Sequence, residues 1–106
     1  MMQLTSDEER WAVWMVQARH FAKRQNFLDA VARMKRVRDE IHHALDEATD
    51  PKRRERLELH RARAEEQLAI LESQYEAWRS RIAERRQRTI DQAAEEMARP
   101  LPVPAD

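Results

Sequence analysis

The residues best suited to chemistry lie at Glu40-Ile41-His42-His43, where a glutamate precedes a histidine by three residues. On a helix this spacing puts the carboxylate and the imidazole on one face, and di-iron carboxylate bundles use two such steps. With His60 across a turn, Glu40 and His43 are weak candidates for a metal site. A single match of four residues is not specific, and Glu40 and His43 lie off the apolar seam described below. We therefore predict no metal site and no cofactor, only a charged surface near a turn.

The chain lacks the residues that most enzymes use for covalent or phosphate chemistry. It contains no cysteine and no glycine, which removes thiolate nucleophiles and the glycine loops that bind phosphates. Its serines, Ser6, Ser73 and Ser80, have no histidine at a comparable level of the predicted fold. We therefore predict that the protein is not an enzyme.

A cluster of arginines near the C-terminal end is the strongest charged feature. Its members are Arg79, Arg81, Arg85, Arg86 and Arg88, with Glu84 as the one acid among them. Such a cluster suits an anion, either a nucleic-acid backbone or an acidic protein surface, unless it is simply a solvated face. The net charge of zero and the lack of aromatic residues between the basic ones count against nucleic acid.

Capping residues and a proline mark the elements that position these groups. The stretch Thr5-Ser6-Asp7-Glu8-Glu9 contains two overlapping capping boxes, which predicts a helix start near Ser6. Asp50-Pro51 ends that helix near Ala48 and begins another, because proline suits the first helical position. We expect a frayed segment at 1–5, a helix over 6–48, a turn at 49–50, a helix over 51–98 and an extended proline-rich tail at 99–106.

The apolar residues in the first half of the first helix form two bands. One contains Trp11, Trp14, Met15, Ala18, Phe21, Ala22 and Leu28, and the other contains Val13, Val16, Phe27 and Val31. A surface helix buries a single stripe, so two bands indicate contact with more than one neighbour. Tryptophan is also enriched at the centres of protein interfaces. We therefore predict a partner interface formed by Trp11, Val13, Trp14, Met15, Val16, Phe21 and Phe27.

Both predicted helices also carry a seam of the coiled-coil type. The first seam is Phe27, Val31, Met34, Ile41, Leu45 and Ala48, and the second is Leu57, Ala64, Leu68, Leu71, Tyr75, Trp78 and Ile82. After Ile82 the frame slips by four residues before Ile90, Ala93, Ala94 and Met97. A short turn makes the helices antiparallel, which pairs Trp14 with Ile90 and places the arginine cluster beside Arg19, Lys23 and Arg24. These three residues complete the predicted anion-binding patch.

The patterns together predict an all-α fold, an antiparallel two-helix hairpin that completes a four-helix bundle by dimerisation or by docking on a partner. One such seam buries too little apolar surface to offset the conformational entropy that so long a hairpin loses on folding. We expect a non-enzymatic protein–protein interaction module, such as an adaptor, assembly or chaperone-like hairpin, that binds itself or a larger bacterial-type assembly.

Two further functions stay open as alternatives. The first is a nucleic-acid-binding helical bundle that uses the Arg79–Arg88 cluster, and the second is a metal-binding ferritin-like bundle. The longest apolar run, Trp11–Val16, is too short to cross a bilayer, so we expect no membrane insertion and a cytoplasmic location.

Overall fold

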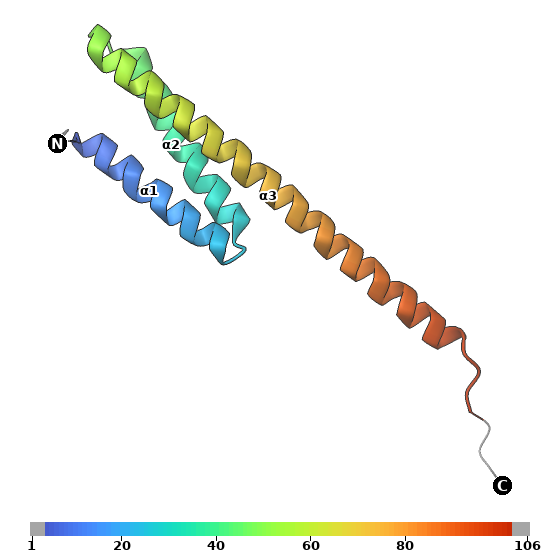
Figure 1. The fold of residues 1–106 in the computed structure, drawn as a ribbon. Helices are drawn as coiled ribbons and strands as arrows, with labels where there is room; N and C mark the ends of the chain where they lie inside the picture. The colour runs from blue at the N-terminus through green and yellow to red at the C-terminus, as the bar shows by residue number, and fades with distance from the viewer. Residues whose placement is uncertain (1–3, 103–106) are drawn as a thin grey trace. The chain divides into compact units, whose positions relative to one another are not determined.

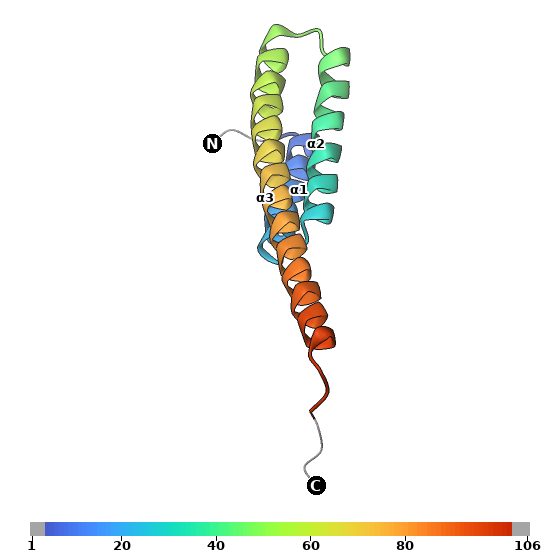
Figure 2. The same cartoon turned by 90° about the vertical axis from the view of Figure 1, so that its right-hand side faces the viewer.

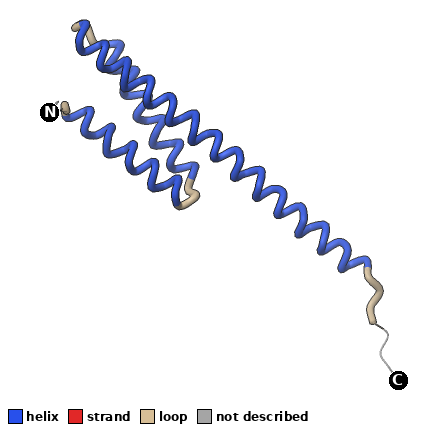
Figure 3. The backbone as a smooth tube through the Cα atoms, viewed as in Figure 1, coloured by secondary structure: helices blue, strands red, loops and turns tan. Residues whose placement is uncertain are grey.

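The computed structural model describes residues 4–102, which form three α-helices and no strand (Figures 1 and 3). Helix α1 spans Ser6–Lys23, α2 spans Phe27–Glu47 and α3 spans Pro51–Ala98. The predicted all-α class is confirmed for this part of the chain. The expectations for residues 1–3 and 103–106 lie outside the described residues. The chain divides into two compact units, with the boundary between Tyr75 and Glu76.

Thr5 begins α1 through a capping box. The backbone N–H of Glu8 donates to Thr5 Oγ1 at 3.2 Å, and the backbone N–H of Thr5 donates to Glu8 Oε1 at 3.3 Å. Of the two overlapping boxes in the sequence, the structure uses the one between Thr5 and Glu8. The acidic residues Asp7 and Glu9 in the same turn also suit the positive end of the helix dipole.

The helix predicted over residues 6–48 is instead two helices, because the chain turns back at residues 24–26. The turn is a Schellman motif, in which the N–H of Gln25 bonds to the Ala22 carbonyl at 3.0 Å and the N–H of Asn26 bonds to the Phe21 carbonyl at 2.9 Å. Gln25 has a φ of 62°, the left-handed conformation that glycine usually supplies at this position. The reversal therefore forms without glycine or proline.

Asp50 and Arg54 hold the turn between α2 and α3. Asp50 Oδ2 accepts a hydrogen bond from the backbone N–H of Arg53 at 3.2 Å, as an N-cap does. Arg54 Nη1 donates to the carbonyl oxygens of Leu45 at 2.7 Å and Ala48 at 2.9 Å. The last carbonyl groups of a helix depend on partners from outside its ladder, so a basic side chain of α3 completes the end of α2.

The first unit is a three-helix bundle made by one chain. Helices α1, α2 and the part of α3 up to Tyr75 lie side by side, each antiparallel to the next along the chain (Figures 1 and 2). The core residues are Trp11 and Ala18 of α1, Phe27, Ala30, Met34, Val37, Ile41 and Leu45 of α2, and Leu57, Ala64, Leu68 and Leu71 of α3. A three-helix core thus replaces the predicted two-helix hairpin, with α2 as its most buried member.

Candidate functional site

A buried carboxylate ties the first turn of α1 to α3. Glu8 Oε2 lies 2.7 Å from Arg56 Nε and 2.7 Å from His60 Nε2, and only 6% of Glu8 is exposed. Burial has the largest single effect and raises the pKa of Glu8. Hydrogen bonds from His60, Thr5 and Arg56 together outweigh it and hold that pKa below its ordinary value of 4.5. Glu8 is therefore a fixed negative charge that joins two helices, which is not how a general acid is tuned.

Trp11 lies next to this ion pair and belongs to the core. Its ring meets the His60 ring edge-on, with 6.1 Å between centroids and 68° between planes. Its Nε1 donates to Glu40 Oε1 at 3.4 Å, so the buried indole also has a polar partner on α2. Trp11 therefore contacts both other helices of the bundle, in line with the prediction that α1 has more than one neighbour.

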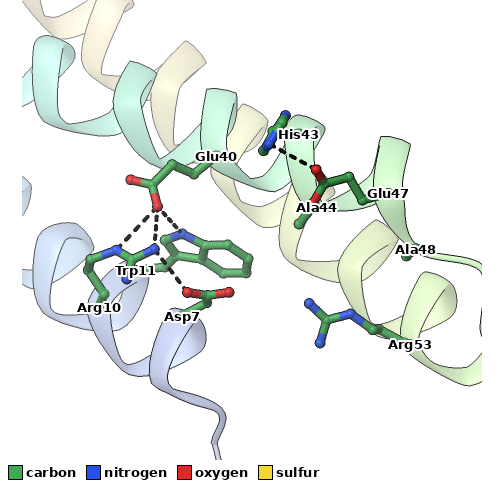
Figure 4. A pocket seen from close by; sticks show the side chains of 9 residues that line it. All are labelled: Asp7, Arg10, Trp11, Glu40, His43, Ala44, Glu47, Ala48 and Arg53. Atoms are coloured by element: carbon green, nitrogen blue, oxygen red, sulfur yellow. Dashed lines mark hydrogen bonds and ion pairs between the residues drawn. The ribbon is translucent and has the colours of Figure 1, made fainter.

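A pocket of about 480 Å³ opens beside Trp11 (Figure 4). It is lined by Asp7, Arg10, Trp11, Glu40, His43, Ala44, Glu47, Ala48 and Arg53. Among these lining residues none is a serine, threonine or cysteine, so the described wall of the pocket offers no hydroxyl or thiol nucleophile.

Arg10 neutralises the acidic side of that pocket. Its Nε and Nη2 atoms donate to Glu40 Oε1 at 3.2 and 2.5 Å, and Nη2 also donates to Asp7 at 3.0 Å (Figure 4). The hydrogen bond to Glu40 is the main reason that the pKa of Arg10 is raised above its ordinary value. The pocket wall is thus a set of paired charges between α1 and α2, and these pairs orient the helices.

The three weak metal candidates each have a separate partner. Glu40 bonds to Arg10, His43 Nε2 lies 3.3 Å from Glu47 on its own helix, and His60 pairs with Glu8. Within residues 4–102, no group of three histidine, aspartate or glutamate side chains is arranged to hold a metal ion. The geometry therefore gives no support to the ferritin-like alternative.

The residues of the predicted partner interface fall into three groups. Trp11 and Phe27 are buried in the bundle, Trp14, Met15 and Phe21 are half-buried, and Val13 and Val16 are exposed. Trp14 has the guanidinium groups of Arg10, Arg33 and Arg36 within 4.8–5.8 Å of its ring centroid. Most of the aromatic band therefore serves contacts inside the first unit.

The second unit contains the C-terminal part of α3, in which the apolar residues beyond the half-buried Trp78 are exposed. In α3 every residue from Arg79 to Ala98 is exposed, including Ile82 at 43%, Ile90 at 51% and Met97 at 87%. Short helices in water depend on packing of an apolar face for most of their stability. The predicted seam thus continues beyond Leu71, the last buried residue of α3, through the half-buried Tyr75 and Trp78 into the exposed residues 79–98.

The predicted anion-binding patch is divided between the two units. Arg19 and Lys23 lie on α1 and Arg24 caps its end, whereas Arg79, Arg81, Arg85, Arg86 and Arg88 belong to the second unit. The predicted pairing of these two groups depends on a single helix over 6–48. The chain instead reverses at Gln25, so this pairing no longer follows. The five arginines of the Arg79–Arg88 cluster are all exposed.

Sequence reasoning missed the Glu8–Arg56–His60 contact because it joins residues 48 and 52 positions apart that meet only when α1 folds back. The available signal was the pair of apolar bands on residues 11–31, which already required two neighbours for α1.

In comparisons with protein-family models, curated proteins and solved structures, no match was found. Across the described residues, no helix is both long and apolar enough to span a membrane.

Proposed function

We propose that the protein is a non-enzymatic protein–protein interaction module. In this proposal the three-helix bundle is a stable support, and the helix of the second unit is the element that binds. The observation that carries it is that every residue from 79 to 98 of α3 is exposed, including Ile82, Ile90 and Met97. These side chains continue an apolar seam, and exposed apolar faces of this kind mark interaction sites.

The paired charges of the first unit support a structural role for it. Its buried acid is held by Arg56 and His60, and two acids of the 480 Å³ pocket, Asp7 and Glu40, are held by Arg10. Catalytic groups usually have a pKa moved toward the working pH, whereas the pKa of Glu8 is moved away from it. A cytoplasmic location stays an expectation from the sequence.

The test is sedimentation velocity of the labelled 106-residue chain in an extract of its own cells. Only the label is detected, so the sedimentation rate of this chain alone is measured. We expect the wild type to sediment faster than a 12.7 kDa chain. Ile82→Asp combined with Ile90→Asp should return it to the rate of the free chain. The matched control is Val13→Asp with Val16→Asp, which places the same charges on exposed positions of α1. Equal behaviour of the two double variants would count against the proposal.

Nucleic-acid binding is the second candidate, because the five arginines of the Arg79–Arg88 cluster are exposed. It is separated by treating the extract with nuclease before sedimentation. A fast-sedimenting species that nuclease abolishes would favour nucleic acid, and one that survives would favour a protein partner. Binding to nucleic acid should also weaken steeply with salt, because phosphate contacts release counterions.

A further inference from the structure

The first unit has a second pocket, in which Trp11 again forms part of the wall. Its volume is about 470 Å³, within the range of about 300–1,000 Å³ that is typical of small-molecule sites. Two of its apolar side chains, Leu4 and Val16, are 42% and 49% exposed, so a bound molecule would remove apolar surface from water. The apolar side chains that line the pocket are Leu4, Trp11, Ala12, Met15, Val16 and Ile41.

Among the described residues that line this pocket, Glu8 is the one acid, and its carboxylate is already neutralised. Its Oε1 accepts a hydrogen bond from the Thr5 hydroxyl at 3.0 Å, and its Oε2 lies 2.7 Å from both Arg56 Nε and His60 Nε2. A cation that entered the pocket would therefore meet no free carboxylate on this part of its wall.

Two guanidinium groups of the same pocket have no such partner. Arg19 of α1 and Arg63 of α3 both line the pocket, and both are exposed. Within residues 4–102, neither side chain forms an ion pair or a hydrogen bond. With Arg56, which pairs with Glu8, the wall has three arginines against one glutamate, a charge of +2 when His60 is neutral. The charge left over is therefore positive, which favours an anion.

We propose that this pocket binds a small amphiphile, a molecule with an apolar chain and one carboxylate head group. The chain packs on the apolar wall formed by Trp11, Ala12 and Met15, and the carboxylate accepts hydrogen bonds from Arg19 or Arg63. Guanidinium groups suit this role, because their paired N–H donors match the two oxygens of a carboxylate. The site goes beyond the proposed function, since it lies on the first unit and does not involve residues 79–98.

The affinity of such a ligand should depend on both of its parts. Each further methylene group that is buried should tighten binding by about fourfold. A head group of the opposite sign should weaken binding, because it would lie beside two unpaired arginines. A ligand of this size also leaves the sedimentation rate of the chain nearly unchanged, so the test of the proposed function is independent of it.

Isothermal titration calorimetry of the 106-residue chain with decanoate and dodecanoate tests the apolar part, at concentrations below those at which they form micelles. Dodecanoate should bind up to about fifteenfold more tightly, because it adds two methylene groups. Dodecyltrimethylammonium has the same chain with a cationic head and should bind about tenfold more weakly than dodecanoate, or less tightly still. Equal affinities for the anion and the cation would overturn the role of the arginines.

Variants locate the site. Arg19→Gln combined with Arg63→Gln should weaken the binding of dodecanoate by about tenfold or more, because hydrogen bonds between charged groups are lost. The matched control is Arg81→Gln with Arg85→Gln, which removes two exposed arginines outside the first unit and should bind dodecanoate like the wild type. Ala12→Leu should block binding by filling the pocket, and circular dichroism checks that every variant keeps its helices.

Three results would overturn the proposal. The first is a wild-type chain that does not bind dodecanoate at millimolar concentration. The second is equal loss of affinity in the two double variants, which would mean that the head group is not held in this pocket. The third is binding of a peptide with the sequence of residues 99–106 in place of dodecanoate, which would assign the pocket to a peptide segment.

Discussion

His60 Nε2 lies 2.7 Å from Oε2 of Glu8, and this pair joins the first turn of α1 to α3 across 52 residues of sequence. The same Glu8 completes the capping box with Thr5. One carboxylate therefore starts a helix and also docks it on the bundle. Removing it should affect both the start of α1 and its packing.

Glu8→Gln should destabilise the first unit by about 1–3 kcal/mol, because the hydrogen bonds to a charged and buried acceptor are weakened. Urea unfolding followed by circular dichroism measures the change. The control is Glu9→Gln, since Glu9 is exposed and acidic in the same turn. That control should stay within about 0.5 kcal/mol of the wild type. Equal losses in the two variants would show that the Glu8 contacts are not special.

The same carboxylate predicts a loss of stability in acid. Because the pKa of Glu8 is lower in the folded state than its ordinary value of 4.5, its ionised form stabilises the fold above that pH. This contribution is lost as the pH falls through the lower folded pKa. The difference in free energy of unfolding between wild type and Glu8→Gln should therefore shrink below pH 4.5. A difference that grew with acidification would contradict the sign of the shift.

Gln25 offers a test of the reversal between α1 and α2. The left-handed conformation raises the free energy of a residue with a Cβ atom by about 1–2 kcal/mol. Glycine avoids this strain but loses more backbone entropy on folding, which costs about 0.5–1 kcal/mol. Gln25→Gly should therefore stabilise the bundle by about 0.5–1 kcal/mol. Gln25→Val should destabilise it, because a β-branched residue fits φ of 62° poorly. Thermal unfolding of both variants gives the comparison, and the opposite order would argue for a continuous helix.

Truncation of leucines should separate the core from the exposed part of α3. Leu68→Ala or Leu71→Ala should cost about 2–5 kcal/mol, because both side chains are buried. Ile82→Ala, at an exposed position of the same helix, should leave the free energy of unfolding of the monomer nearly unchanged.

Deleting residues 100–106 should likewise leave the melting temperature nearly unchanged. A large effect of the deletion would mean that the tail packs on the fold.

Replacing Arg81, Arg85 and Arg88 with glutamine should weaken association and not folding. All three side chains are exposed, so the unfolding free energy of the monomer should change by less than about 0.5 kcal/mol. Association of the wild type with its protein partner should weaken as the salt concentration rises, because exposed charges are screened beyond about 10 Å at 0.1 M. The triple variant should associate more weakly and with less dependence on salt, as measured by sedimentation. Unchanged association would remove the arginines from the interface.

Much of the fold could be predicted from local patterns. Periodic apolar residues such as Leu57, Leu68 and Leu71 indicate a helix with one buried face, and the structure buries all three. The reversal at Gln25 could not be predicted, because its left-handed conformation is carried by a residue with no preference for it. There the packing of α1 onto two neighbours outweighs the local cost of the turn.

The candidate site divides in the same way. The exposure of Ile82 and Ile90 depends on how much of the α3 seam the other helices cover. The sequence of α3 alone could not predict this, because the covering residues belong to other segments of the chain. The sequence shows the seam but not its occupants. The role of Trp11 illustrates this, because a residue suited to an interface became the centre of an intramolecular one.

Hydrogen exchange by mass spectrometry tests the central claim most directly, because it reports on residues 79–98 separately from the bundle. In the dilute free chain we predict fast exchange for amides of residues 79–98 and slow exchange for those around Met34 and Ile41 of α2, which are almost fully buried. On assembly the amides of residues 79–98 should become protected while those of α2 change little. Slow exchange of residues 79–98 in a sample that is strictly monomeric would contradict the account, because the helix would then need no partner.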